Sequence, residues 1–263
     1  MKIGIFDSGL GGLIIARAIH KAMPEYDYVY LGDTKRVPYG NRSAKVVADF
    51  LKEGVEFLFK QDCALVIVAC NTASSEARRT IQENFISKKY PDRKALGVVV
   101  PSAEECLNYK RVGVLATRGT VASKTFEKEI LKLNKNIKVF QNSAPMLVPL
   151  AEEGESELVL PFIKKYLKPL LEKNIEALVL GCTHYPMFKN DIKKLLPNGV
   201  KIISQDEIIP EKLKDYLARH PEVNKKLSKK GEMKILVTDL TQNIEKLSKE
   251  WFGRNAKSKL VKI

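Results

Sequence analysis

The sequence predicts an α/β protein made of two similar open parallel-sheet domains, related by pseudo-twofold symmetry, with the functional site in the cleft between them. Two observations predict this class. Short apolar runs alternate with helical segments along the chain, and part of the pattern of the first hundred residues returns in the second hundred. Alternation of this kind is typical of parallel sheets covered by helices on both faces.

Nine short runs predict the strands of these sheets. Most are rich in β-branched residues and are continuously apolar, as expected for strands that are buried on both faces. They cover residues 2–6, 28–31, 65–69, 96–100, 111–115, 137–141, 178–181, 200–203 and 234–238. Helical patterns cover residues 13–23, 207–219 and 241–252, and a polar stretch spans 221–231.

An internal repeat relates the two halves of the chain. Two pairs of segments align at nearly the same offset, namely 2–9 with 111–118 and 64–72 with 177–183. Cys70 therefore corresponds to Cys182, and each follows a buried strand at the sheet edge where ligands bind in open α/β folds. Because a chain that crosses to a second domain often finishes on the first, we expect one domain of residues 1–98 plus 207–263 and another of 99–206.

Composition and charge are those of an ordinary folded protein. Hydrophobic residues make up 44% of the 263 residues, and no apolar run approaches the roughly 20 residues that a membrane helix needs. Residues 1–5 run into a glycine turn and predict a strand rather than a signal peptide, so we expect a cytoplasmic location. The net charge of +14 is dispersed as single lysines and short pairs, which favours a solvated surface over a nucleic-acid or membrane partner.

The four cysteines include no Cys-x-x-Cys pair, and in a reducing compartment we expect thiols rather than disulfides. Cys63 and Cys106 lie in strand and helix patterns and are expected to be buried structural residues. Cys70 and Cys182 occupy matching positions of the repeat, each followed by Thr or Asn-Thr. This match favours a shared chemical role for Cys70 and Cys182.

A glycine-rich turn, Asp-Ser-Gly-Leu-Gly-Gly at residues 7–12, lies between the first strand and a helix. Its backbone N–H groups and the positive helix end suit an anion. The dinucleotide fingerprint would need Gly where Ile14 stands, and no P-loop is present, so a carboxylate ligand fits better than a nucleotide. A tight turn alone explains the last two glycines equally well, but it does not explain Asp7 and Ser8.

Polar residues surround both matching cysteines. Cys70 begins the run Cys-Asn-Thr-Ala-Ser-Ser at a strand-to-helix junction, where a helix N-terminus is expected to lower the pKa of the thiol. Thr72 and Ser74 in this run fit equally well as helix N-caps. In the second half, His184 follows Cys182 by two residues and could hold or relay its proton.

Six motifs, taken in order, resemble the glutamate racemase family. They are Asp-Ser-Gly-x-Gly-Gly at 7–12, Pro-Tyr-Gly at 38–40, Cys-Asn-Thr-Ala-Ser at 70–74, Thr-x-x-Thr at 117–120, Pro-Leu-Ala-Glu at 149–152 and Gly-Cys-Thr-His-Tyr-Pro at 181–186. The two cysteine motifs are the most specific, and the tail is a weaker match. His-Tyr-Pro after the second cysteine is similar to the glutamate enzymes rather than to the related aspartate racemases.

This resemblance implies a racemase that interconverts L- and D-glutamate with no cofactor or metal. It implies that Cys70 removes the α-proton of D-glutamate and Cys182 that of L-glutamate, the other thiol donating a proton each time. It also implies that Asp7 assists Cys70, and that His184 and Glu152 assist Cys182. Besides Asp7, His184 and the cysteines, the substrate-binding residues that it implies are Ser8, Pro38, Tyr39, Gly40, Asn71, Thr72, Thr117, Thr120 and Thr183.

The resemblance also implies a homodimer and a supply of D-glutamate for peptidoglycan. Without it, Glu152 fits better as one more acid of an acidic surface run. The rival from another class is a two-lobed protein that only captures a small ligand, although capture needs no opposed thiols. A nucleic-acid-binding role would rest on the positive charge alone.

Overall fold

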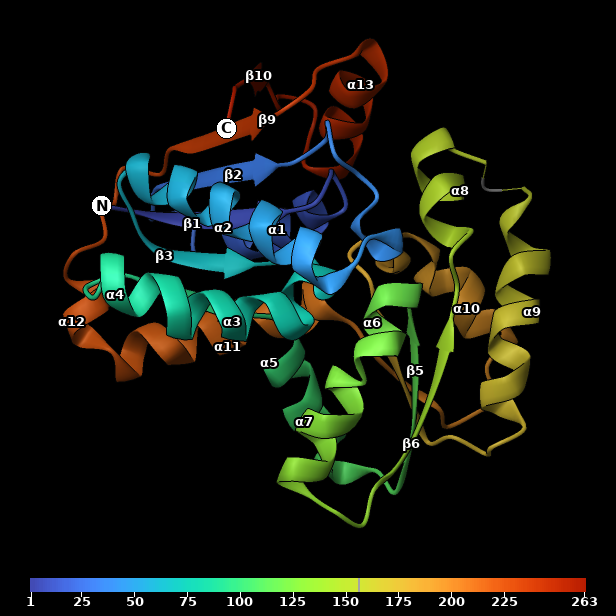
Figure 1. The fold of residues 1–263 in the computed structure, drawn as a ribbon. Helices are drawn as coiled ribbons and strands as arrows, with labels where there is room; N and C mark the ends of the chain where they lie inside the picture. The colour runs from blue at the N-terminus through green and yellow to red at the C-terminus, as the bar shows by residue number, and fades with distance from the viewer. Residues whose placement is uncertain (156) are drawn as a thin grey trace.

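The computed structural model describes residues 1–155 and 157–263, and their strands form two parallel sheets (Figure 1). The larger sheet has six strands in the order β10-β9-β2-β1-β3-β4, and the smaller has four in the order β6-β5-β7-β8. Every strand pairing in this described part is parallel. The α/β class with two parallel sheets is therefore confirmed.

The strands are short and lie close to the predicted positions. Those of the larger sheet are β1 (Lys2–Asp7), β2 (Tyr28–Gly32), β3 (Cys63–Val68), β4 (Lys94–Gly97), β9 (Met233–Val237) and β10 (Ser258–Leu260). Those of the smaller sheet are β5 (Arg111–Ala116), β6 (Lys138–Ser143), β7 (Ala177–Gly181) and β8 (Lys201–Ile203).

The two sheets share one topology, as the repeat in the sequence predicts. β1 pairs with β2 and β3, and β3 pairs with β4, while β5 pairs in the same way with β6 and β7, and β7 with β8. Strands β9 and β10 of the C-terminal tail extend the larger sheet beyond β2 (Figure 1). The exact limits of the two domains, 1–98 with 207–263 and 99–206, stay a prediction.

Helices connect the strands and differ widely in length. They are α1 (Gly12–Ala22), α2 (Ala44–Lys60), α3 (Arg78–Ile81), α4 (Ser87–Lys89), α5 (Val99–Glu104), α6 (Arg118–Ser123), α7 (Thr125–Leu133), α8 (Leu147–Glu153), α9 (Val159–Leu171), α10 (Lys189–Leu195), α11 (Gln205–Arg219), α12 (Pro221–Asn224) and α13 (Gln242–Trp251). Two π-helical turns, Ala73–Ala77 and Gln82–Ile86, join α3 and α4 into one continuous helical segment.

Helices cover both faces of each sheet. On the larger sheet, α1, α11 and α13 form one core with Ile3 and Ile5 of β1, whereas α2 and the segment around Ile81 pack against Phe6 on the other face. On the smaller sheet, α8, α9 and α10 cover one face, and α5 and α7 cover the other. Because side chains alternate along a strand, neighbouring residues of β1 enter different cores.

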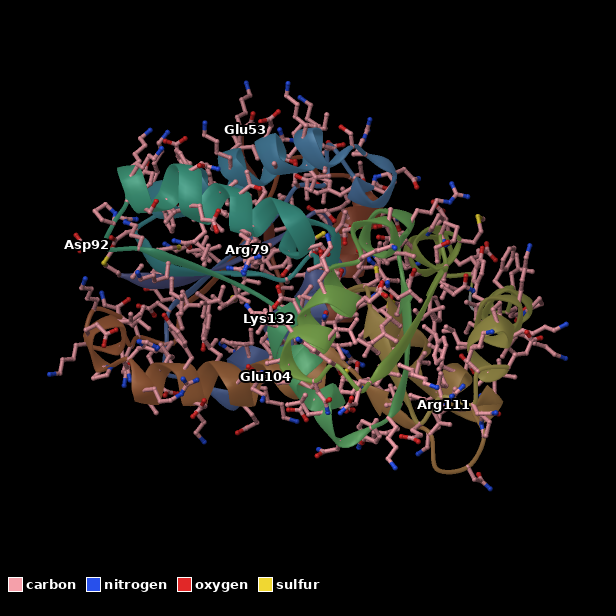
Figure 2. The ribbon with its side chains drawn as sticks, turned by 60° about the horizontal axis from the view of Figure 1, so that its bottom comes forward. Glu53, Arg79, Asp92, Glu104, Arg111 and Lys132 are labelled. Atoms are coloured by element: carbon pink, nitrogen blue, oxygen red, sulfur yellow. The ribbon has the colours of Figure 1, made fainter. Side chains whose placement is uncertain are left out.

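Charged side chains of both signs are mixed over the outside of the molecule. Figure 2 shows them around the ribbon, with Glu53, Arg79 and Lys132 among those labelled. Several form ion pairs on the surface, such as Lys89–Glu56, Lys194–Asp191 and Arg219–Asp215. Among the described helices, none combines the length and the apolar character that crossing a bilayer requires.

Residues 96–100 do not form a single strand, contrary to the expectation from the sequence. β4 ends at Gly97, and the backbone N–H of Val98 donates to Ser74 Oγ at 2.9 Å, which removes this donor from the sheet. Helix α5 then begins at Val99, and its third residue, Pro101, suits the first helical turn because it has no N–H to satisfy. The sequence pattern also misses β10, a short and largely exposed edge strand.

A glycine sets the distance between α2 and β1. A Cβ added to Gly54 on α2 would collide with the ring of Phe6, which is fully buried. That ring also lies 6.4 Å from the ring of Tyr39, measured between centroids, so it has little room to move. The helix can approach the strand only because position 54 carries no side chain.

We expect Gly54→Ala to destabilise the protein by about 1–3 kcal/mol, because overpacking outweighs the roughly 1 kcal/mol that Ala normally gains over Gly in a helix. Chemical denaturation followed by circular dichroism measures the change. In a Phe6→Leu background the same substitution should cost less, because the smaller side chain leaves space for the methyl group. A Gly54→Ala protein more stable than the wild type would contradict the role of this contact.

Candidate active site

A small cavity lies where strands of both sheets end. Its walls follow the carboxyl ends of β1, β3, β5 and β7, together with the loop after β2 and one residue of α8. The lining residues are Ser8, Val37, Pro38, Tyr39, Gly40, Cys70, Asn71, Thr72, Thr117, Val148, Cys182, Thr183 and His184. One cavity thus contains both cysteines of the repeat, one contributed by each sheet.

Cys70 is buried at the end of β3, where the chain turns into a π-helical segment. Burial raises the pKa of its thiol to about 12, and the negative charge of Asp7 adds to the rise, while hydrogen bonds from Ser8 and the backbone of Ala73 oppose it. The sequence-based expectation of a lowered pKa at this junction is therefore wrong. The helix start does help the thiolate, but desolvation is the larger effect.

Cys182 follows β7 and lies beside His184. Its Sγ is 3.9 Å from His184 Nδ1, and Nε2 of the same imidazole is 3.0 Å from Oε1 of Glu152. Burial opposes protonation of the imidazole, but its hydrogen bonds with Cys182 and Glu152 outweigh this effect and raise the pKa of His184 to about 10. The rings of His184 and Trp251 of α13 are also nearly perpendicular, with 5.5 Å between centroids.

Asp7 lies behind the cavity wall and joins the two halves of the site. Its Oδ2 accepts a hydrogen bond from the backbone N–H of Gly9 at 3.0 Å, and its Oδ1 accepts one from Thr183 Oγ1 at 3.3 Å. Burial raises the pKa of the fully buried carboxyl, while the positive charge of His184 lowers it in part. One carboxylate therefore contacts the turn after β1 and the turn after β7.

Three threonine hydroxyls meet across the cavity wall. Thr72 Oγ1 lies 2.9 Å from Thr117 Oγ1 and 3.3 Å from Thr120 Oγ1, and the last two are 3.0 Å apart. Thr117 also caps α6 by accepting from the backbone N–H of Thr120. Gly40 lies against the same residue, because a Cβ at position 40 would be only 2.8 Å from Thr117 Cβ. The first and second halves of the chain are thus in direct contact here.

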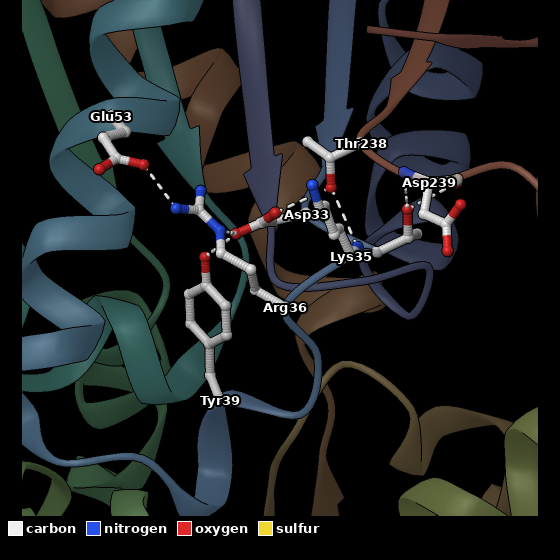
Figure 3. A network of polar contacts seen from close by, with 8 residues as sticks. Asp33, Lys35, Arg36, Tyr39, Glu53, Thr238 and Asp239 are labelled. Carbon is white, nitrogen blue, oxygen red and sulfur yellow. Dashed lines mark hydrogen bonds and ion pairs between the residues drawn. The ribbon is translucent and has the colours of Figure 1, made fainter. Parts of the chain in front are cut away.

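The loop that carries Tyr39 is anchored by a buried aspartate (Figure 3). Asp33 accepts hydrogen bonds from Tyr39 Oη at 2.5 Å, from Arg36 Nε at 2.6 Å and from Thr238 Oγ1 at 2.8 Å. Arg36 in turn binds Glu53 of α2. The Tyr39 hydroxyl is thus engaged with Asp33, and burial together with the charge of Asp33 raises its pKa.

Most of the residues predicted from the sequence lie at the cavity, and three lie just behind it. Asp7, Thr120 and Glu152 do not line the cavity, but each is hydrogen-bonded to a lining residue, Thr183, Thr117 and His184 respectively. Two apolar lining residues, Val37 and Val148, were not predicted.

Asp33, the anchor of the Tyr39 loop, was also not predicted. Its position directly after β2, four residues before the turn at 37–41, is the only signal in the sequence. The remaining two cysteines, Cys63 and Cys106, are free thiols buried in the cores. No group of three or more His, Cys, Asp or Glu side chains is arranged to hold a metal ion in the ranges 1–155 and 157–263.

The fold and this cavity define a two-sheet α/β protein with one thiol from each sheet at a shared site. The family model described as Asp/Glu/Hydantoin racemase matches residues 14–208. A glutamate racemase of Aquifex aeolicus is 38% identical over 266 residues, which cover 99% of this chain and 98% of that protein. A glutamate racemase of a Thermoanaerobacter species is 39% identical over 235 residues, covering 88% of this chain and 86% of the relative.

Solved structures agree with these matches over the whole chain. Glutamate racemase from Francisella tularensis, solved in complex with D-glutamate, is 33% identical with a TM-score of 0.89 and covers 99% of this chain and 97% of its own. The RacE1 isoform from Bacillus anthracis is 32% identical with a TM-score of 0.90, covering 100% and 97%. The chain belongs to the Asp/Glu/Hydantoin racemase family, within its glutamate racemase branch, so the resemblance seen in the motifs is confirmed.

We expect His184 to titrate near pH 10 and Glu152→Gln to lower this pKa by about 1–3 pH units, because the substitution removes a negative charge within hydrogen-bond distance. Histidine side-chain NMR shifts recorded from about pH 5 to about pH 11, a range that includes both expected pKa values, measure the change. Glu222→Gln, which removes the carboxylate 3.0 Å from the exposed His220, is the matched control and should leave His184 unchanged. Titration of wild-type His184 near its ordinary value would contradict the ion pair.

Proposed function

We propose that this chain is a glutamate racemase that inverts the α-carbon by a two-base proton transfer between Cys70 and Cys182, without a cofactor. One observation carries the proposal: two cysteines from equivalent strand ends of the two sheets line a single cavity. Inversion needs one group that removes the α-proton from one face and another that delivers a proton to the opposite face. Two thiols on different walls of one site meet that requirement.

The relatives support the choice of glutamate as substrate. The Aquifex aeolicus relative and one from a Sulfurihydrogenibium species, which align with nearly the whole chain, are glutamate racemases, and the Francisella tularensis enzyme was solved with D-glutamate bound. The aspartate racemase of Picrophilus torridus is only 19% identical with a TM-score of 0.56, so it supports the fold alone. Glutamate is therefore favoured over aspartate.

The proton moves between carbon and sulfur in each direction. With D-glutamate, the α-proton passes to the thiolate of Cys70, and the thiol proton of Cys182 then bonds to the opposite face of the α-carbon. This leaves L-glutamate, a protonated Cys70 and a thiolate at Cys182, the arrangement from which the reverse reaction starts. Atoms and charges balance, and no electron acceptor is needed.

Preorganised groups must supply much of the barrier reduction, because an α-hydrogen is a very weak acid. The raised pKa of Cys70 makes its thiolate a stronger base than an ordinary cysteine, but it also lowers the thiolate fraction. We assign Asp7 to the Cys70 side, and His184 with Glu152 to the Cys182 side, as the groups that assist each proton transfer.

Polar groups around the cavity are the ones available to bind the substrate. Removal of one preorganised donor typically costs about 3–4 kcal/mol in the transition state. The polar groups that we assign to the substrate carboxylates and ammonium are Ser8, Asn71, Thr72, Thr117, Thr120 and Thr183, together with the backbone N–H groups of Tyr39 and Gly40, while Pro38 lines the same part of the cavity.

The family also supports a biological setting. We propose that the chain supplies D-glutamate for peptidoglycan, that it acts in the cytoplasm, and that it forms a homodimer, the commonest closed assembly. Dispersed positive charge without any further feature gives no support to a nucleic-acid partner. A protein that only captures its ligand would have no use for a second thiol in the same cavity.

Enzyme dialysed exhaustively against a chelator, with no pyridoxal phosphate added, should racemise L- and D-glutamate at full rate in deuterated water. Each inverted molecule should carry an α-deuteron, because the proton delivered comes from a thiol that exchanges with solvent. Optical rotation and α-deuterium content, followed together with both aspartates as comparison substrates, identify reaction and substrate. Binding without exchange would refute the racemase, and activity restored only by a metal or by pyridoxal phosphate would refute the cofactor-free mechanism.

In the same assay, Cys70→Ala and Cys182→Ala should each lower the rate of racemisation by about 10²–10⁴-fold or more, because each removes one of the two proton-transfer groups. Cys63→Ala and Cys106→Ala are the matched controls, since these cysteines are buried in the cores and do not line the cavity. Wild-type turnover in either cavity variant would exclude the two-base assignment.

A further inference from the structure

A series of buried, hydrogen-bonded amide and hydroxyl groups leads from the cavity to the two points where the polypeptide crosses between the sheets. Asn71, which follows Cys70 and lines the cavity, pairs reciprocally with Gln205: Asn71 Nδ2 donates to Gln205 Oε1 at 2.8 Å, and Gln205 Nε2 donates to Asn71 Oδ1 at 2.6 Å. Gln205 Nε2 also donates to Ser102 Oγ at 3.3 Å. All three residues are at most 2% exposed.

The hydroxyl of Ser102 determines which way both amides face. Ser102 Oγ donates its proton to the carbonyl oxygen of Val98 at 2.7 Å, so toward Gln205 it can only accept. A flipped Gln205 would place Oε1 against this acceptor, and Gln205 must therefore present Nε2. Asn71 must then present Oδ1 to Gln205 Nε2, because the reverse would set two N–H groups against each other.

The fixed orientation leaves one N–H hydrogen of the Asn71 amide available to the cavity. The Oδ1 atom and one Nδ2 hydrogen are paired with Gln205, and the second Nδ2 hydrogen has no partner among the described residues. Asn71 is thereby held as a hydrogen-bond donor beside Cys70. A carboxylate, or the oxygen of an α-carbanion in its enolate form, is the chemical partner that such a donor would stabilise.

Ser102 and Gln205 lie at the two places where the polypeptide crosses between the sheets. Ser102 is on α5, directly after β4, where the chain leaves the larger sheet, and Gln205 is the first residue of α11, directly after β8, where it returns. Lys212 of α11 binds Glu104 and Glu105 near the end of α5, at 2.9 and 3.1 Å, so the two crossings are also joined at the surface.

We propose that Gln205 is a positioning residue: together with Ser102 it orients the Asn71 amide as a donor to substrate on the Cys70 side of the cavity. This inference rests on the racemase function proposed above. It goes further because it assigns an effect on proton transfer at Cys70 to Gln205, a residue that does not line the cavity. Asn71 could not keep its orientation if position 205 were apolar, because Gln205 supplies both hydrogen bonds that hold its amide.

The test compares Gln205→Met, which keeps the length but removes all three amide hydrogen bonds, with Glu207→Gln, a control on the same turn of α11 whose carboxylate binds Lys189 at the surface. We expect kcat/KM of Gln205→Met to fall by about 10- to 100-fold, as for loss of a hydrogen bond to a charged group. Because the two enantiomers are equally stable, this fall must be the same in both directions, so it cannot by itself show which thiol is affected.

The α-deuterium isotope effect supplies the readout that a merely structural role would not change. If Gln205 acts through Asn71, the isotope effect with D-glutamate should rise, because abstraction at Cys70 becomes more rate-limiting, and KM should rise as well. A loss of active protein would instead lower kcat with unchanged KM and unchanged isotope effects, and that result would overturn the proposal.

A second substitution covers the case in which Gln205→Met does not fold. Ser102→Ala keeps the Asn71–Gln205 pair but removes the group that orients it, and it should give a weaker change of the same kind, with the side-chain amide NMR signals of Asn71 shifted. Unchanged kinetics in folded Gln205→Met, or in folded Ser102→Ala where Gln205→Met does not fold, would refute the inference. Absence of racemisation in the wild type would refute the proposed function instead, so the two failures are distinguishable.

Discussion

The site depends on a buried carboxylate that is shared by both halves of the chain. Asp7 ends β1 of the larger sheet, yet one of its oxygens is bound by Thr183 from the turn after β7 of the smaller sheet. A buried charge without compensation is costly, and the compensation here comes from two backbone N–H groups, this hydroxyl and the charge of His184. The positions of Asp7, Thr183 and His184 are therefore interdependent, and through them so are the positions of the two sheets.

This contact explains the glycines of the first turn better than backbone freedom does. Gly11 has φ −55° and ψ −33°, which any residue adopts, so the turn itself does not require glycine there. A Cβ at Gly11 would instead lie 2.5 Å from His184 Nδ1 and from Thr183 Oγ1, and one at Gly12 would lie 2.5 Å from Asp7 Cβ. Gly11 is needed because the turn after β7 of the second sheet approaches closely, and Gly12 because the side chain of Asp7 packs against the turn.

Features repeated along the chain were predictable, and features that arise from contacts between distant segments were not. The alternation of strands and helices and the repeated cysteine motif predict two similar sheets, because both are properties of local sequence. No repeated pattern marks Asp33 or Val148. Asp33 also binds Thr238 of the distant tail, and Val148 reaches the cavity from α8. The raised pKa of Cys70 was missed for the same reason, because desolvation depends on everything packed around the thiol.

The two halves match in backbone but differ in charge. Beside Cys70 lies the carboxyl of Asp7, whereas beside Cys182 lies His184, whose pKa is raised to about 10 by its hydrogen bonds with Cys182 and Glu152. A racemase has no need for equal groups on its two walls, because equal stability of the two enantiomers fixes the ratio of kcat/KM values whatever the acidity of each thiol. What the reaction does require is that one thiol be charged when the other is protonated. The repeat therefore supplies two equivalent thiol positions, and its divergence gives the two thiols unlike neighbours, a carboxyl beside Cys70 and an imidazole beside Cys182.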